Sequence, residues 1–96
     1  MNQDILVTGG SGQVGQSLQE LVWPDGVQLH APLRCELDLT NEKSIFSALE
    51  SRNWAAIVNA GAYTNVDAAE TAFEEAWKIN ALAPAFIASY ARKKRI

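Results

Sequence analysis

The chain has 96 residues, enough for one domain, and its 48% hydrophobic and 20% charged residues are ordinary for a globular protein. Its only cysteine, Cys35, excludes an internal disulfide and suits a reducing compartment. No apolar run reaches the roughly 18 residues that a membrane helix needs, and the N-terminus lacks the basic region of a signal peptide. We therefore expect a cytoplasmic location and no membrane partner.

The formal charge of −3 is unevenly distributed along the chain. Four basic residues lie together at Arg92–Arg95, and the remaining residues carry four basic and 11 acidic side chains. This balance argues against a basic nucleic-acid surface, so we expect no nucleic-acid partner. The terminal cluster is typical of cations at the negative end of a helix dipole, and a nucleic-acid tail is the alternative.

The first half of the sequence alternates between strand and helix patterns. Asp4–Thr8 is a short apolar run without polar alternation, as in a parallel strand covered on both faces. Apolar residues then recur at helical spacing from about Gly12 to Val22, and Trp23–Gly26 ends this predicted helix. A second strand is expected over Val27–Ala31.

The second half continues the alternation. A helix capped by Thr40 or Asn41 is expected to turn Ile45, Phe46 and Leu49 inward. A third strand is expected over Trp54–Asn59, followed by a largely helical stretch from about residue 67 to the C-terminus. One face of that helix would carry Phe73, Ala76, Trp77, Asn80, Ala83 and Ile87. The order predicts an α/β fold with three αβα layers, a parallel sheet and right-handed crossovers.

A glycine-rich segment, Gly9–Gly15, directly follows the first strand and opens the first helix. Its Gly-x-x-Gly-x-x-Gly pattern permits a tight turn and close approach of the backbone to a pyrophosphate, next to the positive end of the helix dipole. The pattern predicts a Rossmann-type dinucleotide site, of which only the first βαβαβα half is present. Its candidate residues are Gly9, Gly12, Gln13, Val14 and Gly15. The alternative is a turn whose glycines only permit close helix–strand packing.

The end of the second strand should lie near the adenosine ribose. NAD-selective sites usually place an acid there, but the first charged residue is Arg34, whose guanidinium suits the 2′-phosphate of NADP. Glu36 is close enough to keep NAD open, and an exposed loop charge is the alternative for Arg34. Asp38 would accept from the adenine amino group while Leu39 faces the ring, or Asp38 would help to cap the next helix.

The third strand ends in small residues, where ligands bind in open α/β sheets. Ala60, Gly61 and Ala62 leave room for a cofactor, and a close-packed strand end is the alternative. The run Asn59–Glu70 resembles the signature of the dTDP-4-dehydrorhamnose reductases, a branch of the extended short-chain dehydrogenase/reductase family. Val7–Gly15, with its Gly-Gln-Val-Gly, resembles the same branch, as do Leu37–Thr40 and Lys78–Ala81.

This resemblance covers nearly the whole chain and implies an oxidoreductase that uses NADP(H), or alternatively NAD(H). The reaction implied is reduction of the C4 keto group of a dTDP-4-keto-6-deoxy sugar to dTDP-L-rhamnose. The glycine loop would line the pyrophosphate, and Asp38 and Leu39 would face the adenine. The residues along the nicotinamide-side ribose would be Ala60, Gly61, Ala62 and Tyr63. Thr64 and Val66 would border the sugar-nucleotide substrate.

Asn80 and Pro84 give a separate indication. Because Pro84 has no N–H to bond the Asn80 carbonyl, we expect a kink that frees this carbonyl. The resemblance places an asparagine of this helix near a proton-relay water, so Asn80 is a candidate for that relay. The alternative is a tolerated kink without catalytic meaning.

The resemblance also implies catalytic residues further along than residue 96: a Ser or Thr, then a Tyr and a Lys four residues later. Tyr90 and Lys94 have this spacing but precede the expected fourth strand, so we reject them. Residues 1–96 are therefore interpreted as the N-terminal part of an NAD(P)-binding domain, inactive alone. An unpaired edge at the first strand predicts homodimerisation or exposed apolar surface. The alternatives are a related sugar-nucleotide epimerase or dehydratase, a non-catalytic nucleotide-binding subunit, or an interaction module.

Overall fold

The computed structural model describes residues 3–62 and 73–96. Three strands, β1 (Gln3–Thr8), β2 (Val27–His30) and β3 (Trp54–Asn59), form one parallel sheet of order β2-β1-β3. The predicted strands are confirmed at nearly the same bounds. The expectation of an unpaired edge at the first strand is wrong, because both neighbours pair with β1 and it lies in the centre. Within the described residues, the outer edges of the sheet belong to β2 and β3.

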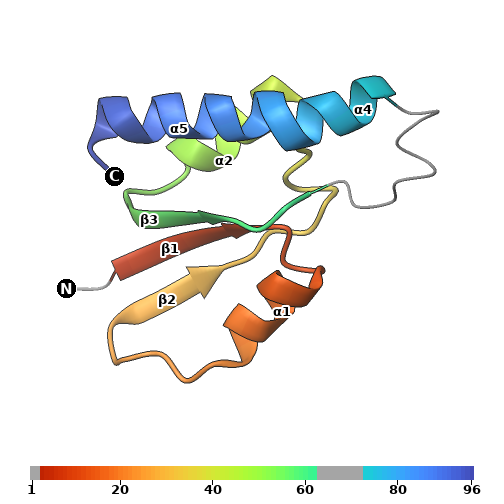
Figure 1. The fold of residues 1–96 in the computed structure, drawn as a ribbon. Coiled ribbons are helices and arrows are strands. Elements are labelled where there is room, and N and C mark those ends of the chain that lie inside the picture. Colours follow the sequence, from red (N-terminus) through yellow and green to blue (C-terminus); the bar gives the residue numbers. More distant parts are fainter. Residues whose placement is uncertain (1–2, 63–72) are drawn as a thin grey trace.

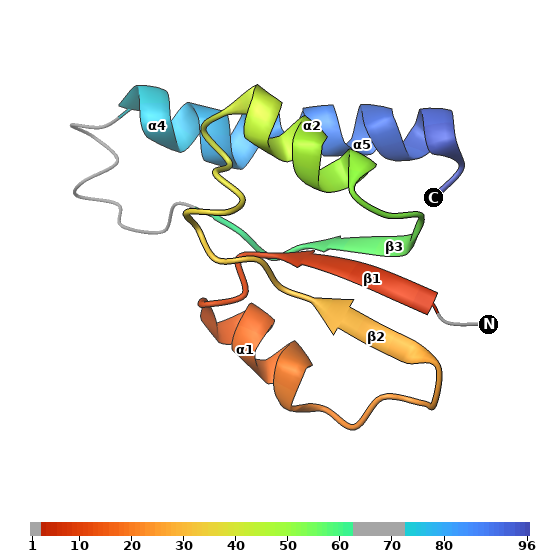
Figure 2. The same cartoon turned by 180° about the vertical axis from the view of Figure 1, so that it is seen from behind.

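Helices cover both faces of this sheet (Figures 1 and 2). Helix α1 (Gln13–Glu20) lies on one face, and α2 (Glu42–Glu50) and α5 (Ala83–Lys94) lie on the other. The short helix α4 (Phe73–Trp77) and the π-helical turn η1 (Lys78–Leu82) lead directly into α5. The three-layer αβα arrangement of a Rossmann-type fold is thereby confirmed.

The larger part of the core lies between the sheet and the α2–α5 layer. Leu6 of β1 is 1% exposed and packs in one cluster with side chains of these two helices. The other buried members are Leu37, Ile45, Leu49, Trp54, Ala83 and Ile87. Asn41 caps α2, as one of the two predicted candidates, because its side chain accepts from the Ser44 N–H at 3.2 Å. Phe46, predicted to face inward, is 49% exposed and meets only the edge of the Tyr90 ring.

Helix α1 is shorter than predicted. It ends at Glu20, where the Leu21 N–H turns back to the Leu18 carbonyl and the Trp23 indole N–H caps the same oxygen at 2.8 Å. Val22 is therefore outside the helix and fully exposed. Within α1, Gly15 is buried and Leu18 is half-buried, whereas Val14 is 61% exposed.

The C-terminal helical stretch buries the predicted face only in its second half. Phe73 and Trp77 are 70% and 51% exposed and stack on each other at 6.4 Å between ring centroids. Asn80 is exposed as well, whereas Ile79, Ala83 and Ile87 are buried. A π-turn bonds residue i to i+5 instead of i+4, so η1 shifts the helical phase between the two ends of the stretch.

The predicted kink at Pro84 is also wrong. Pro84 lies in the first turn of α5, where a missing N–H is tolerated. The preceding Ala83 N–H donates to the Lys78 carbonyl across the π-turn. Figure 1 shows α4, η1 and α5 as one continuous run, because the π-turn accommodates the proline without a bend. No helix in residues 3–62 and 73–96 is long and apolar enough to cross a membrane.

Candidate functional site

The loops that follow the three strands meet at the carboxyl edge of the sheet. In Figure 1 the arrowheads point toward the start of α1 and toward α4, whereas the C-terminal end of α5 lies at the opposite edge. The parallel register places Thr8 beside Asn59 at this edge. The predicted candidates of the glycine loop, of Arg34–Leu39 and of Ala60–Ala62 therefore come from loops on one side of the sheet.

Thr8, the last residue of β1, forms hydrogen bonds with the end of β3 and the loop that follows it. It is 1% exposed, and its hydroxyl donates to Asn59 Oδ1 and accepts from the Gly61 N–H at 3.3 Å. Its carbonyl accepts from the Ala60 N–H at 3.2 Å. Sequence reasoning missed Thr8, although a polar residue ending an apolar strand just before a glycine was a usable signal.

Gly9 and Gly61 are the closest backbone approach between these loops. Gly9 has φ of +68°, and a Cβ there would lie 2.5 Å from the Gly61 Cα. A Cβ on Gly61 would collide with the Leu39 side chain, which reaches in from the loop after β2. Glycine at both positions therefore lets the three loops converge, since a larger residue at Gly9 would displace backbone and one at Gly61 would displace the Leu39 side chain.

The N-terminus of α1 opens from the glycine loop. Gly12 is its N-cap and offers no side chain to bond the first N–H groups of the helix. Side chains of α1 hold the glycine loop in place. Gln19 Nε2 donates to the carbonyls of Gly10 and Gly15 at 2.8 and 2.9 Å. Gln16 Nε2 similarly donates to the Ser11 carbonyl at 2.7 Å. The result is a fixed set of backbone donors at the positive end of a helix dipole, an arrangement suited to an anion.

The other members of the glycine motif differ in position. Gly15 is buried, and a Cβ there would lie 2.6 Å from the Gly10 Cα, so this glycine lets α1 pack against its own loop. Gln13 and Val14, in the first turn of α1, are exposed at the site. A Cβ on Gly12 would meet only the Gly9 carbonyl at 3.4 Å, which leaves the space in front of the helix open.

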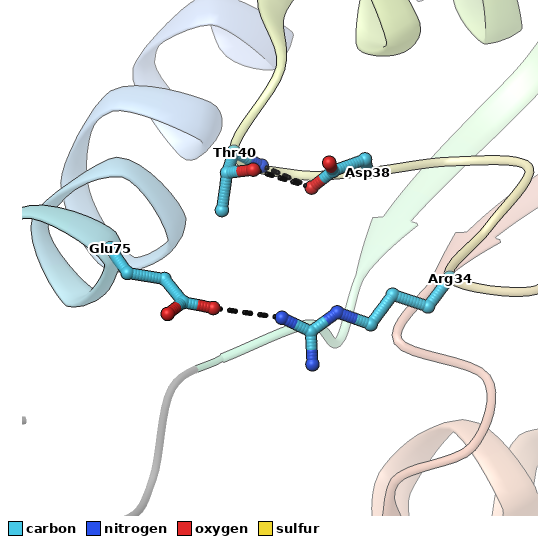
Figure 3. A network of polar contacts seen from close by, with 4 residues as sticks. All are labelled: Arg34, Asp38, Thr40 and Glu75. Atoms are coloured by element: carbon cyan, nitrogen blue, oxygen red, sulfur yellow. Dashed lines mark hydrogen bonds and ion pairs between the residues drawn. The ribbon is translucent and has the colours of Figure 1, made fainter. Parts of the chain in front are cut away.

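Asp38, in the loop after β2, accepts two hydrogen bonds that order the backbone there (Figure 3). Its Oδ1 accepts from the Thr40 N–H at 2.9 Å and from the Thr40 hydroxyl at 2.7 Å. These hydrogen bonds, with help from the positive charges of Arg34 and Lys78, hold the pKa of Asp38 below its ordinary value. The Asp38 N–H donates to Ser44 Oγ at 2.9 Å. Asp38 thus orders the turn before α2 but is not its cap, and no described residue donates to its Oδ2.

Arg34 lies on the same loop but points away from the glycine segment. Its Nη2 lies 2.8 Å from Oε1 of Glu75 on α4 (Figure 3), and its side chain is 75% exposed. Glu36, the acid that kept NAD open, accepts from the Leu33 N–H at 3.0 Å and does not contact Arg34. Sequence reasoning missed Glu75, because 41 residues separate it from Arg34.

The remaining candidates are less closely defined. Ala60 and Gly61 are half-buried and Ala62 is exposed at the end of β3, whereas Asn80 lies on η1 as an exposed residue. Tyr63, Thr64 and Val66 lie outside the described residues. Among those described, no group of three His, Cys, Asp or Glu side chains is placed to hold a metal ion.

Tyr90 and Lys94, rejected from the sequence as a catalytic pair, lie at the far edge of the fold. The Tyr90 hydroxyl contacts Glu50 Oε1 at 3.0 Å and the Leu49 carbonyl at 3.3 Å, at the end of α2. Lys94 Nζ lies 5.8 Å from the centre of the Tyr90 ring. The contacts of Tyr90 join α5 to α2, the contact of Lys94 lies within α5, and neither residue contacts the described part of the carboxyl edge.

Residues 2–96 match a family model described as RmlD substrate binding domain. The chain belongs to this family. It is 38% identical to a dTDP-4-dehydrorhamnose reductase of Aggregatibacter actinomycetemcomitans over 91% of this chain and 30% of that protein. It is 36% identical to a dTDP-4-dehydrorhamnose reductase of Streptomyces griseus over 91% of this chain and 29% of that protein.

Solved structures of the same kind agree with the fold. The dTDP-4-dehydrorhamnose reductase of Bacillus anthracis in complex with NADP superposes with a TM-score of 0.84 at 30% identity, over 95% of this chain and 32% of that one. The chain thus spans about 30% of the length of the curated relatives that it matches. The family resemblance read from the sequence and the Rossmann-type fold are both confirmed.

Proposed function

We propose that residues 1–96 form the N-terminal, cofactor-binding part of an NADP(H)-dependent reductase. The reaction proposed for the whole protein is reduction of the C4 keto group of a dTDP-4-keto-6-deoxy sugar to dTDP-L-rhamnose. One observation carries the proposal: the N-terminus of α1 is uncapped by side chains and opens onto the point where Gly9 and Gly61 meet. The family relatives named as dTDP-4-dehydrorhamnose reductases support the substrate class.

The described residues fit a dinucleotide. The N–H groups of Gln13 and Val14 that begin α1 would bind the pyrophosphate, next to Gly12, whose own N–H donates to the Gly9 carbonyl at 3.0 Å. A bulkier residue at Gly9 or Gly15 would displace that loop. Asp38 Oδ2 would accept from the adenine amino group, beside the half-buried Leu39. Ala60, Gly61, Ala62 and Tyr63 would border the nicotinamide-side ribose. When bound, the nicotinamide supplies the hydride.

The preference for NADP(H) over NAD(H) rests on Arg34. Its guanidinium is 75% exposed on the loop after β2, and no acid of that loop contacts it. A planar guanidinium can donate two parallel hydrogen bonds to a phosphate, which a 2′-hydroxyl cannot match. The NADP-bound relative from Bacillus anthracis supports the same choice.

The substrate and proton-transfer roles remain proposals for particular residues. Thr64 and Val66 would border the sugar nucleotide, and Asn80 would belong to a proton relay, although the kink that first singled it out is not present. We place no catalytic acid in this chain, because the contacts of Tyr90 and Lys94 are at the other end of α5. The 96 residues alone should bind cofactor without reducing a sugar.

We further propose that the chain forms a homodimer, acts in the cytoplasm and has no nucleic-acid or membrane partner. Exposed apolar surface supports self-association, since Val22 is fully exposed and Phe73 is 70% exposed. The exposed, unpaired thiol of Cys35 supports a reducing compartment.

Calorimetric titration of the chain with NADPH and with NADH tests the proposal. We expect tighter binding of NADPH, and Arg34→Gln should weaken NADPH about tenfold or more, since a hydrogen bond to a charged group is worth about 1.5–3 kcal/mol. Arg52→Gln is the matched control, because Arg52 is an exposed arginine at the amino end of β3. Absence of binding to either cofactor would refute the proposal.

A further inference from the structure

The ion pair between Arg34 and Glu75 joins two distant parts of the carboxyl edge. Arg34 belongs to the loop after β2, and Glu75 belongs to α4, on the side of the sheet toward which the strands point (Figures 1 and 3). The 2.8 Å ion pair is exposed to solvent, since the Arg34 side chain is 75% exposed and the Glu75 side chain is 40% exposed. Such a pair is weak and easily exchanged for another partner.

Glu75 is the only carboxylate among the described residues that contacts the Arg34 guanidinium. Glu74, its neighbour, instead pairs with Lys78 at 3.3 Å along the same helix. Glu36 bonds the Leu33 N–H within its own loop. Asp38 is influenced by the charge of Arg34, but among the described residues it forms no ion pair with Arg34, and its Oδ1 accepts from Thr40. The partner of Arg34 is therefore set by α4 and not by its own loop.

A carboxylate and a phosphate offer a guanidinium the same kind of acceptor, namely a pair of anionic oxygens that can accept two parallel hydrogen bonds. We propose that Glu75 competes with the 2′-phosphate of NADP(H) for Arg34 and so limits how strongly the site prefers NADP(H) to NAD(H). This inference rests on the proposed function, because it requires that Arg34 faces the 2′-position. Glu75 then acts through Arg34 as a specificity-determining residue and has no contact of its own with the cofactor.

The competition should lower the affinity for a 2′-phosphorylated ligand. The apparent affinity for a 2′-phosphorylated ligand equals the intrinsic affinity multiplied by the fraction of molecules in which Arg34 is free of Glu75. Since exposed ion pairs are weak, removing Glu75 should raise this affinity roughly two- to fivefold. A ligand with a 2′-hydroxyl does not need Arg34 to be free, so removing Glu75 should not change its affinity.

The test uses the full chain and two adenosine ligands that differ at the 2′-position, adenosine 2′,5′-bisphosphate and 5′-AMP, titrated by calorimetry. Glu75→Gln should bind the bisphosphate two- to fivefold more tightly than the unmodified chain and bind 5′-AMP equally well. Glu74→Gln is the matched control, because it removes the same charge one residue away without touching Arg34. In an Arg34→Gln background, Glu75→Gln should have no effect on either ligand.

Three results would overturn the inference and leave the proposed function intact, provided that the unmodified chain binds both ligands. The first is equal bisphosphate affinity in Glu75→Gln and Glu74→Gln. The second is an equal gain for 5′-AMP, which would indicate a general charge effect. The third is weaker binding of the bisphosphate in Glu75→Gln, which would mean that Glu75 presents Arg34 to the phosphate. If the unmodified chain binds neither ligand, the proposed function and the inference both fail.

Discussion

Gly9 and Gly61, which are 52 residues apart in the numbering, meet so closely that a Cβ on Gly9 would lie 2.5 Å from both the Cα and the N of Gly61. The contact closes the gap between the loop after β1 and the loop after β3. The Thr8 hydroxyl stabilises this contact by accepting a hydrogen bond from the Gly61 N–H. The shape of the carboxyl edge therefore depends on two residues that have no side chains.

Replacing Gly9 with alanine should destabilise the chain by at least about 2 kcal/mol. The positive φ of 68° costs an L-residue about 1–2 kcal/mol, and the collision with Gly61 adds to this. Urea unfolding followed by tryptophan fluorescence, to which buried Trp54 contributes, measures the loss.

Gly12→Ala is the matched control for that change. Gly12 has an ordinary φ of −79°, and a Cβ there meets only the Gly9 carbonyl at 3.4 Å. We expect a loss of less than about 1 kcal/mol, from the poorer N-cap. Equal stability of the two variants would contradict the assigned role of Gly9.

Asn41→Ala should cost about 1 kcal/mol of stability, because it removes the side-chain acceptor of the Ser44 N–H at the start of α2. Ser47→Ala, on the exposed face of the same helix, should stay within about 0.5 kcal/mol of the unmodified chain. A loss no larger in Asn41→Ala than in Ser47→Ala would show that the cap contributes nothing.

The pKa of Asp38 should lie below its ordinary value of 3.8 in the folded chain, chiefly because the Thr40 hydroxyl and N–H donate to it. Its contribution to stability is therefore fully present above about pH 3.8 and is lost as the pH falls through the lowered pKa. Thr40→Val removes the hydroxyl donor and should raise the pKa, as measured by NMR titration of the carboxyl carbon. An unchanged pKa in Thr40→Val would disprove the assigned cause.

The pKa of Tyr90 is raised by burial and by its hydrogen bond to Glu50, so this contact favours folding below pH 10 and is lost as the pH rises through the raised pKa. Tyr90→Phe keeps the ring against Phe46 but removes the hydroxyl from the Glu50 contact. We expect a loss of about 0.5–1.5 kcal/mol at neutral pH, measured by urea unfolding. A variant as stable as the unmodified chain would show that this hydroxyl does not join α5 to α2.

Local patterns predicted most of the fold. The strand Trp54–Asn59 and the glycine turn after β1 follow from apolar runs and from backbone freedom, which are properties of a few adjacent residues. The phase of the C-terminal helix could not be predicted, because the π-turn η1 adds a residue to one turn without a distinctive composition.

The places of the candidate site residues in the fold were predictable to the same extent. The glycines and Asp38 carry local signals, and the structure brings their loops to one edge of the sheet. Glu75 carries no such signal, since its contact with Arg34 depends on how α4 is placed by the tertiary fold. The buried role of Thr8 likewise depends on the pairing of β1 with β3.

The most direct test of the cofactor site is an NMR titration of the ¹⁵N-labelled chain with NADPH, read at the backbone amides. We expect the largest shifts at Gly12, Gln13 and Val14, with smaller ones at Leu39 and Gly61, and none near the far end of α5. Shifts confined to the apolar hollow between β3 and α5, whose lining includes Ala88 and Ile96, or no shifts at all, would contradict it.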